Sequence, residues 1–283
     1  SLKKAVSVEP KYVDAHYNLA ITFKELDRLD ESVKSYQKVI EINPNFAQAY
    51  NNLGNVFNEL SQTDEAIQSY KKAIAIKPDF AQAYNNLGNL YKDLEHYDNA
   101  LQSYQTAIKI NPNVAEAHNN LGNVHKDLEQ YNDAIQSYEK AIQINPQFAE
   151  AYYNLGLTMR LLKQLDLAVK SLWQAIEINP NYAEAYNNLG SCFTLLGETN
   201  SAIDCYQKSL DINPDYAEVH NSLGNTLNML GRVKAGIKCF EKAIEINPNF
   251  AEAYNSLGNA YKKTKQREKS LVFFQKAMIL VEE

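Results

Sequence analysis

The sequence predicts an all-α protein built from a row of similar helix pairs, and three observations support this. All eight prolines recur at a spacing of 34 residues: Pro10, Pro44, Pro78, Pro112, Pro146, Pro180, Pro214 and Pro248. Apolar side chains recur at helical spacing twice between successive prolines. Small and aromatic residues also return at fixed positions. Because proline lacks a backbone donor and restricts the residue before it, the prolines divide the chain into equivalent units.

The register of these residues predicts where each unit begins and ends. Eight units are expected, at residues 13–46, 47–80, 81–114, 115–148, 149–182, 183–216, 217–250 and 251–283. Residues 1–12 are expected to be the second-helix remnant of a truncated repeat. Since every residue then belongs to a repeat, we expect no separate domain in this chain.

Each unit is expected to begin with a first helix. In the third unit, Tyr84, Leu87, Gly88 and Tyr91 lie three or four residues apart, which places them on one face of a helix. The glycine at this register is small, so it allows a neighbouring helix to approach closely. We therefore expect each first helix to pack tightly against a second helix of the same unit.

The second helix of each unit follows the same logic. Ala100, Tyr104, Ala107 and Ile108 again lie at helical spacing. Short polar residues precede this stretch in six units and are expected to cap the second helix: Asp30, Asp64, Asp98, Asn132, Asp166 and Asn200.

The 34-residue pattern of aromatic, Leu-Gly, aromatic, Ala, aromatic, Ala and Pro resembles the tetratricopeptide repeat. The resemblance covers nearly the whole chain. It implies a right-handed superhelical α-solenoid of antiparallel helix pairs. In that family the first helices line an inner, concave wall and the second helices form the outer wall.

Composition narrows the classes of partner and the cellular location. The net charge is −6 and the isoelectric point is near 5.5, which disfavours nonspecific binding to nucleic acid or acidic membranes. No apolar run approaches the roughly 20 residues that span a bilayer. The three cysteines are too few and too irregular for a disulfide framework. We therefore expect a cytoplasmic or nucleocytoplasmic protein that binds neither nucleic acid nor membranes.

The sequence offers no arrangement of residues that is typical of an enzyme. His16, His118 and His220 share the register of Tyr50 and Tyr84, and they lie three repeats apart. This favours an aromatic packing position over a metal site. The chain contains no glycine-rich phosphate loop and no Gly-x-Ser-x-Gly motif. We expect no catalysis, no metal and no cofactor.

Asparagines recur in the middle of the first helices, where helix propensity does not favour them. Their amide carries both a donor and an acceptor, which suits it to the backbone of an extended peptide. We therefore predict that they bind peptide, and the candidates are Asn52, Asn55, Asn86, Asn89, Asn120, Asn123, Asn154 and Asn188. A single asparagine at this register can instead serve local hydrogen bonding between adjacent helices.

The setting Ala-Tyr-Asn-Asn-Leu-Gly-Asn resembles the repeats of O-linked N-acetylglucosamine transferase. In that family an inner row of asparagines holds extended substrate polypeptide. The residues here that match its register are Asn18, Asn52, Asn86, Asn120, Asn154 and Asn188. The resemblance implies that this chain could be the substrate-recruiting arm of a larger glycosyltransferase-like enzyme.

An apolar strip interrupts the polar residues of the first helices. It is predicted to consist of Tyr153, Leu157, Leu161, Leu195 and Met229, which come from three consecutive units. Apolar patches with polar rims mark interaction sites. Burial of the strip against a neighbouring repeat is the alternative.

These observations predict a non-catalytic protein–protein interaction scaffold that holds an extended peptide in its concave groove. The asparagines would bind the main chain of the peptide, and the apolar strip would accept its hydrophobic side chains. An end-to-end self-assembling scaffold is a further alternative, because the last helix ends in Met278, Ile279, Leu280 and Val281 with no polar helix behind it.

Overall fold

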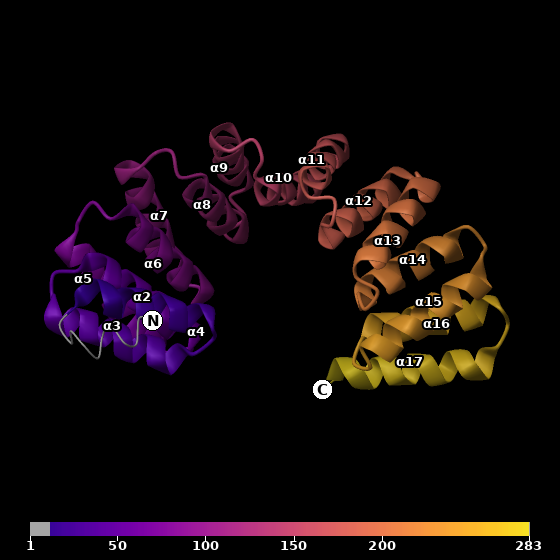
Figure 1. The fold of residues 1–283 in the computed structure, drawn as a ribbon. Helices are drawn as coiled ribbons and strands as arrows, with labels where there is room; N and C mark the ends of the chain where they lie inside the picture. Colours follow the sequence, from indigo (N-terminus) through magenta and orange to yellow (C-terminus); the bar gives the residue numbers. More distant parts are fainter. Residues whose placement is uncertain (1–11, 283) are drawn as a thin grey trace. The chain divides into compact units, whose positions relative to one another are not determined.

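The computed structural model describes residues 12–282, and these form sixteen α-helices arranged as consecutive hairpins (Figure 1). The predicted remnant at residues 1–12 lies outside the described residues except for Tyr12. The first helices of the hairpins are α2 (Val13–Glu25), α4 (Ala47–Glu59), α6 (Ala81–Asp93), α8 (Ala115–Asp127), α10 (Ala149–Leu161), α12 (Ala183–Leu196), α14 (Ala217–Met229) and α16 (Ala251–Lys263).

The second helices have nearly constant length, and the last one is slightly longer. They are α3 (Leu29–Ile42), α5 (Thr63–Ile76), α7 (Tyr97–Ile110), α9 (Tyr131–Ile144), α11 (Leu165–Ile178), α13 (Thr199–Ile212), α15 (Val233–Ile246) and α17 (Arg267–Glu282). The predicted all-α architecture of helix pairs is therefore confirmed. None of the described helices combines the length and apolar character that crossing a membrane requires.

The chain divides into two compact units, one ending at Asn145 and one beginning at Pro146. In the first unit, α4 packs on α5, α5 packs on α6, and α4 also contacts α6. In the second unit, α10, α11 and α12 are related in the same way. Because first helices contact one another, each unit presents a surface made by them, which we term the first-helix face.

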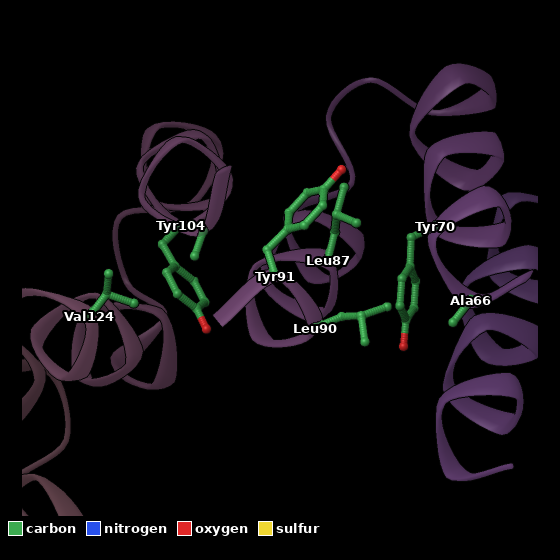
Figure 2. Packing of buried hydrophobic residues seen from close by; sticks show 8 residues of the cluster. Ala66, Tyr70, Leu87, Leu90, Tyr91, Tyr104 and Val124 are labelled. Atoms are coloured by element: carbon green, nitrogen blue, oxygen red, sulfur yellow. The ribbon is translucent and has the colours of Figure 1, made fainter. Parts of the chain in front are cut away.

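The core of each unit consists of clusters of buried side chains between consecutive helices. In the first unit, one buried cluster runs from α5 through α6 to α8 (Figure 2), and its labelled members are Ala66, Tyr70, Leu87, Leu90, Tyr91, Tyr104 and Val124. Gly88 determines how closely α6 and α7 approach, because a Cβ atom there would lie 2.7 Å from the Tyr104 ring. A larger residue at this position would wedge the hairpin apart.

The turn between repeats depends on the residue before each proline as well as on the proline. The Oδ1 atom of Asn43 accepts a hydrogen bond from the backbone N–H of Asn45 at 3.2 Å. Such an Asx turn fixes the chain direction before the next helix. The same bond forms at Asn111, Asn179, Asn213 and Asn247.

The turn within each hairpin contains one residue in the left-handed backbone region. Its φ angle is 56° at Asp27 and 60° at Lys163, and the other non-glycine examples are Ser61, Glu95, Glu129 and Lys265. Only Gly197 and Gly231 supply the residue type that this conformation favours.

The predicted caps of the second helices are wrong. Helix α3 begins at Leu29, so Asp30 lies inside the first turn and Arg28 occupies the capping position without a side-chain bond. The same shift applies to Asp64, Asp98, Asn132, Asp166 and Asn200. The left-handed residue reverses the chain within a turn of only three residues, Leu26, Asp27 and Arg28, so the second helix begins before Asp30. Where the residue is an aspartate, it stabilises the helix through its charge near the positive end of the helix dipole.

Candidate functional site

The asparagines of the first helices bond one repeat to the next in the first unit. The Nδ2 atom of Asn86 donates to Oδ1 of Asn51 and to Oδ1 of Asn55, both at 3.0 Å. Asn120 repeats the pattern toward Asn89 at 2.9 Å and toward Asn85 at 3.4 Å. These amides therefore stabilise the packing of consecutive repeats.

Tyrosine hydroxyls from the second helices complete this network. The Tyr70 hydroxyl donates to Oδ1 of Asn55 at 2.8 Å, and the Tyr104 hydroxyl donates to Oδ1 of Asn89 at 2.7 Å. The equivalent bond joins Tyr138 to Asn123 at 2.8 Å. We term the arrangement at Asn55 and Asn89 the Tyr–Asn relay, because each of these oxygens accepts from a tyrosine of its own hairpin and from an asparagine of the next repeat.

Two tyrosines interrupt the asparagine register and take over its acceptor role. Asn52 donates to the Tyr17 hydroxyl at 2.9 Å, and the Tyr17 ring lies 5.0 Å from the Phe46 ring. In the second unit, Asn188 donates to the Tyr153 hydroxyl at 3.2 Å, and the Tyr153 ring lies 4.9 Å from the Tyr182 ring. Burial raises the pKa of both Tyr17 and Tyr153, as expected for hydroxyls held in a packed junction.

The predicted asparagines therefore differ in what they leave available to a ligand. Asn154 is buried, and Asn52, Asn86, Asn120 and Asn188 are half-buried. The side-chain oxygens of Asn55, Asn89 and Asn123 each accept from a tyrosine, and within the described part of the chain no acceptor takes a hydrogen bond from their Nδ2 atoms. These three amide groups are half-buried on the first-helix face and can donate outward.

The structural role of the asparagines, which the sequence offered only as the alternative to peptide binding, is the one that these bonds show. The bonds that define it join residues 31 and 35 positions apart, which the spacing along one helix does not reveal. The available signal was the tyrosine that follows each of Asn55, Asn89 and Asn123 at the same distance in its second helix.

The predicted apolar strip divides into an exposed part and a packed part. Leu161, Leu195 and Met229 are 52%, 62% and 64% exposed on the first-helix face. Leu157 is half-buried, and Tyr153 is engaged with Asn188 and Tyr182 as described above. We therefore define the apolar row as Leu161, Leu195 and Met229, one residue from each of α10, α12 and α14.

The register of the apolar row carries charge in the other repeats. In the first unit it holds acids, namely Glu25, Glu59, Asp93 and Asp127. Lysines partly neutralise them, since Lys24 lies 2.8 Å from Glu59, and Lys92 lies 4.0 Å from Asp93. In α16 the same register holds Lys263, so this row of side chains changes character along the chain.

Hollows lie between adjacent first helices in both units. In the first unit, a hollow of about 520 Å³ between α2 and α4 is lined by Tyr36, Asn52 and Asn55 among others. In the second unit, a hollow of about 540 Å³ between α14 and α16 is lined by Asn225, Met229, Asn259, Lys262 and Lys263 among others. Both hollows lie on the first-helix face, where the predicted asparagines and the apolar row are also found.

Two histidines of the first helices bond to the backbone of the turn that precedes their own helix. Burial lowers the pKa of His118, and its Nε2 atom lies 3.1 Å from the carbonyl oxygen of Pro112. His220 contacts Pro214 in the same way at 2.9 Å. Within residues 12–282, no three His, Cys, Asp or Glu side chains are grouped so that they could hold a metal ion.

Comparison with protein families identifies one repeat along nearly the whole chain. A profile described as a TPR repeat matches residues 22–60, 54–95, 88–129, 159–193 and 227–265, which together exceed half of the chain. Profiles described as tetratricopeptide repeats match residues 115–148, 183–216, 137–170, 205–238 and 250–283. Among curated proteins, no sequence is similar enough to match.

Several solved structures share this fold. The crystal structure of MamA is 30% identical, with a TM-score of 0.53, and the match covers 57% of this chain and 95% of MamA. YrrB, described as a TPR protein with an unusual peptide-binding site, is 27% identical with a TM-score of 0.55, over 66% of this chain and 96% of YrrB. PilF of Pseudomonas aeruginosa is 19% identical with a TM-score of 0.66, and the match covers 73% of this chain and 94% of PilF. At this identity the match indicates the fold alone.

Proposed function

Because this chain belongs to the tetratricopeptide repeat family, we propose that it is a non-catalytic scaffold that binds an extended segment of a partner protein on its first-helix face. The observation that carries the proposal is the apolar row. Three large apolar side chains, each more than half exposed, occupy one register in three consecutive repeats. Exposed apolar residues that line up across a polar surface mark sites of protein association.

The polar groups around the row suit the main chain of such a segment. In the second unit, Asn225 and Asn259 line the hollow beside Met229. Carboxamides can donate to peptide carbonyls and accept from peptide N–H groups, whatever the peptide sequence. The apolar row then selects for hydrophobic side chains, and the carboxamides hold the backbone.

Substitution within the apolar row tests this proposal. A fluorescent peptide of alternating apolar and polar residues should bind the protein, and Leu161→Asp or Met229→Asp should weaken its affinity at least tenfold, because a charge replaces an apolar contact. The control is Leu167→Asp, which alters a leucine that is 48% exposed on the second helix α11. Circular dichroism should show unchanged helicity in all variants. Equal affinity of Leu161→Asp and wild type would reject the proposed surface.

Self-assembly is the second candidate function, and the exposed side of α17 favours it. Met278, Ile279 and Val281 are 63%, 49% and 77% exposed. A hollow of about 690 Å³ lies beside Met278 and Phe274. Sedimentation that shows concentration-dependent growth, abolished by Val281→Lys, would support this function. A monomer at every concentration would reject it.

We further propose that the scaffold works in the cytoplasm. Cys192, Cys205 and Cys239 are free thiols, and burial raises the pKa of Cys205 to about 12. Protonated, buried thiols are inert packing groups and suit a reducing compartment. The net charge of −6 disfavours nucleic acid and acidic membranes as partners.

A further inference from the structure

The hollow between α14 and α16 differs from the rest of the first-helix face in its charge. Lys262 and Lys263 are both exposed and line it. Within the described residues, neither lysine forms an ion pair, whereas Lys92 and Lys126 each have an aspartate 4.0 Å away. Lys263 Nζ donates only to the backbone oxygen of Asn228, at 3.4 Å. The hollow therefore carries two positive charges without a counter-ion from the chain.

The nearest acid of α16 lies at the far end of the helix. Glu252 is ten residues before Lys262, which corresponds to about 15 Å along a helix axis. Its carboxylate already accepts a hydrogen bond from Nδ2 of Asn221 at 2.9 Å. It therefore does not neutralise the lysines of the hollow.

The Tyr–Asn relay is broken at the same place, which leaves two carboxamides free. Phe240 and Phe274 stand where other repeats have the hydroxyl donors of the relay, so Asn225 and Asn259 lack that partner. No hydrogen bond to a described residue engages either side chain. Asn225 is half-buried, Asn259 is exposed, and both line the hollow.

Besides the two phenylalanines, a serine in place of an asparagine also interrupts the Tyr–Asn relay here. Ser256 stands at the register of Asn86, and its short side chain does not replace the long carboxamide. As a result, Oδ1 of Asn221 is buried without a donor, although the equivalent oxygen of Asn51 receives one from Asn86. Asn225 and Asn259 thus make none of the side-chain bonds that Asn55 and Asn89 make in the first unit, and Asn221 joins the next repeat only through its Nδ2 atom, which donates to Glu252.

We propose that this hollow, the α14–α16 subsite, binds a carboxylate of the partner segment whose hydrophobic side chains lie on the apolar row. The inference rests on the proposed function and adds the chemical class of the ligand. Met229 is the last member of the apolar row and also lines the hollow, so a hydrophobic side chain and an acidic group can be neighbours. Two ammonium groups attract the carboxylate, and two carboxamide donors orient it.

Four amidated or free peptides with one shared apolar segment test the subsite and separate the two sources of a carboxylate. Three of the peptides have an amidated C-terminus and end in two aspartates, two glutamines or two lysines. The fourth ends in two glutamines and has a free terminal carboxylate. A second set carries the same residues at the amino end, because the direction of the segment is open. We expect a peptide with an added carboxylate, from the aspartates or from the free terminus, to bind five- to tenfold tighter than the amidated glutamine peptide. The lysine peptide should bind more weakly than the amidated glutamine peptide. The preference should shrink in 0.5 M salt.

Variants of the lysines assign the preference to the hollow. Lys262→Gln with Lys263→Gln should abolish the preference for acid and preserve affinity for the amidated glutamine peptide. Reversal to Glu at both positions should favour the lysine peptide. The matched control is Lys234→Gln with Lys238→Gln, which makes the same change of net charge at exposed positions of α15 and should leave the preference intact.

The outcomes separate the two proposals. If wild-type protein binds none of the peptides, the proposed function itself is wrong. If the peptides bind and acidic ends confer no advantage, the function stands and the subsite is rejected. If acidic peptides keep their advantage after Lys262 and Lys263 are replaced by Gln and also after they are replaced by Glu, the carboxylate binds elsewhere and the subsite is again rejected.

Discussion

A single asparagine oxygen serves two repeats at once in the first unit. Oδ1 of Asn89 accepts from Tyr104 in its own hairpin and from Asn120 in the next repeat. A carboxamide oxygen has two lone pairs, so it can accept both bonds without distortion. The position is half-buried, where an unmatched polar atom is costly, and this explains why asparagine occupies a site that helix propensity disfavours.

Removal of one donor should therefore destabilise the first unit measurably. Asn86→Ala deletes the two hydrogen bonds that Asn86 donates to Asn51 and Asn55, and also an exposed one that it accepts from Gln82. It leaves Oδ1 of Asn51 buried without a donor, since Asn51 is 2% exposed. We expect a loss of about 1–3 kcal/mol in unfolding free energy, measured by urea titration. Asn58→Ala on the exposed side of α4 is the control and should cost less than about 0.5 kcal/mol. Equal effects of the two variants would contradict the relay.

Buried phenols should make the protein sensitive to alkali. Burial raises the pKa of Tyr36 to about 12 from its ordinary value of 10, and it also raises the pKa of Tyr70 and Tyr104. A pKa higher in the folded state means that unfolding releases protons, so this contribution to stability is complete below pH 10 and is lost as pH rises through 12. Urea midpoints should fall over this range, together with a rise in tyrosinate absorbance.

The Tyr36→Phe variant is the check on that assignment. It removes one titrating phenol, so its stability should decline less steeply above pH 10 than that of wild type. An identical pH dependence of the two proteins would show that Tyr36 does not contribute.

At the scale of the element, every hairpin turn places one residue in the left-handed region, and six of these residues are not glycine. A side chain in this conformation costs roughly 1–2 kcal/mol, and glycine recovers it at the expense of a more flexible unfolded chain. We expect Lys163→Gly to stabilise the protein by about 0.5–1 kcal/mol, measured by urea titration.

The reverse substitution, from glycine to alanine in a hairpin turn, should lower the free energy of unfolding. At Gly197 φ is 80° and no atom lies within 4 Å of an added Cβ, so Gly197→Ala introduces backbone strain without a clash. A loss of about 1 kcal/mol is expected. If Gly197→Ala were neutral, the turn would tolerate a side chain, and the expected gain at Lys163 would lose its basis.

The helix pairs could be predicted because their apolar residues recur at helical spacing and the prolines interrupt them at a constant interval. The capping residues could not. Asp30 and its equivalents precede an apolar stretch as a cap does, yet the left-handed residue Asp27 closes the turn early enough that the helix begins at Leu29 and includes Asp30 in its first turn. Only Gly197 and Gly231 signalled that conformation in the sequence, because the other six turns use residues that do not reveal it.

At the scale of the whole molecule, the candidate site was predictable only where it departs from the repeat. Leu161, Leu195 and Met229 replace charged residues, and such replacements are visible in one sequence. The function of the asparagines depends on partners in other repeats, which requires the packing of the helices. Peptide binding by Asn55, Asn89 and Asn123 stays a prediction for their outward Nδ2 atoms.

Stability and recognition should compete in the second unit. Ser256→Asn with Phe240→Tyr would restore the relay, since the new amide can reach Oδ1 of Asn221 and the new hydroxyl can reach Asn225. We expect a gain of about 1 kcal/mol in unfolding free energy by urea titration, because a buried acceptor regains a donor. The same variant should lose preference for acidic peptides. Gain of stability with unchanged peptide preference would separate the relay from the subsite.

The shared asparagine oxygen also bears on how such a chain can grow. Along α4, α6 and α8, the repeats offer the same asparagine acceptors forward and extend the same asparagine donor backward. A duplicated copy of an interior repeat would meet matching neighbours on both sides, so an in-frame gene duplication of 34 codons would lengthen the protein without any new adaptation at the seam. A duplication of any other length would mismatch every bond across it.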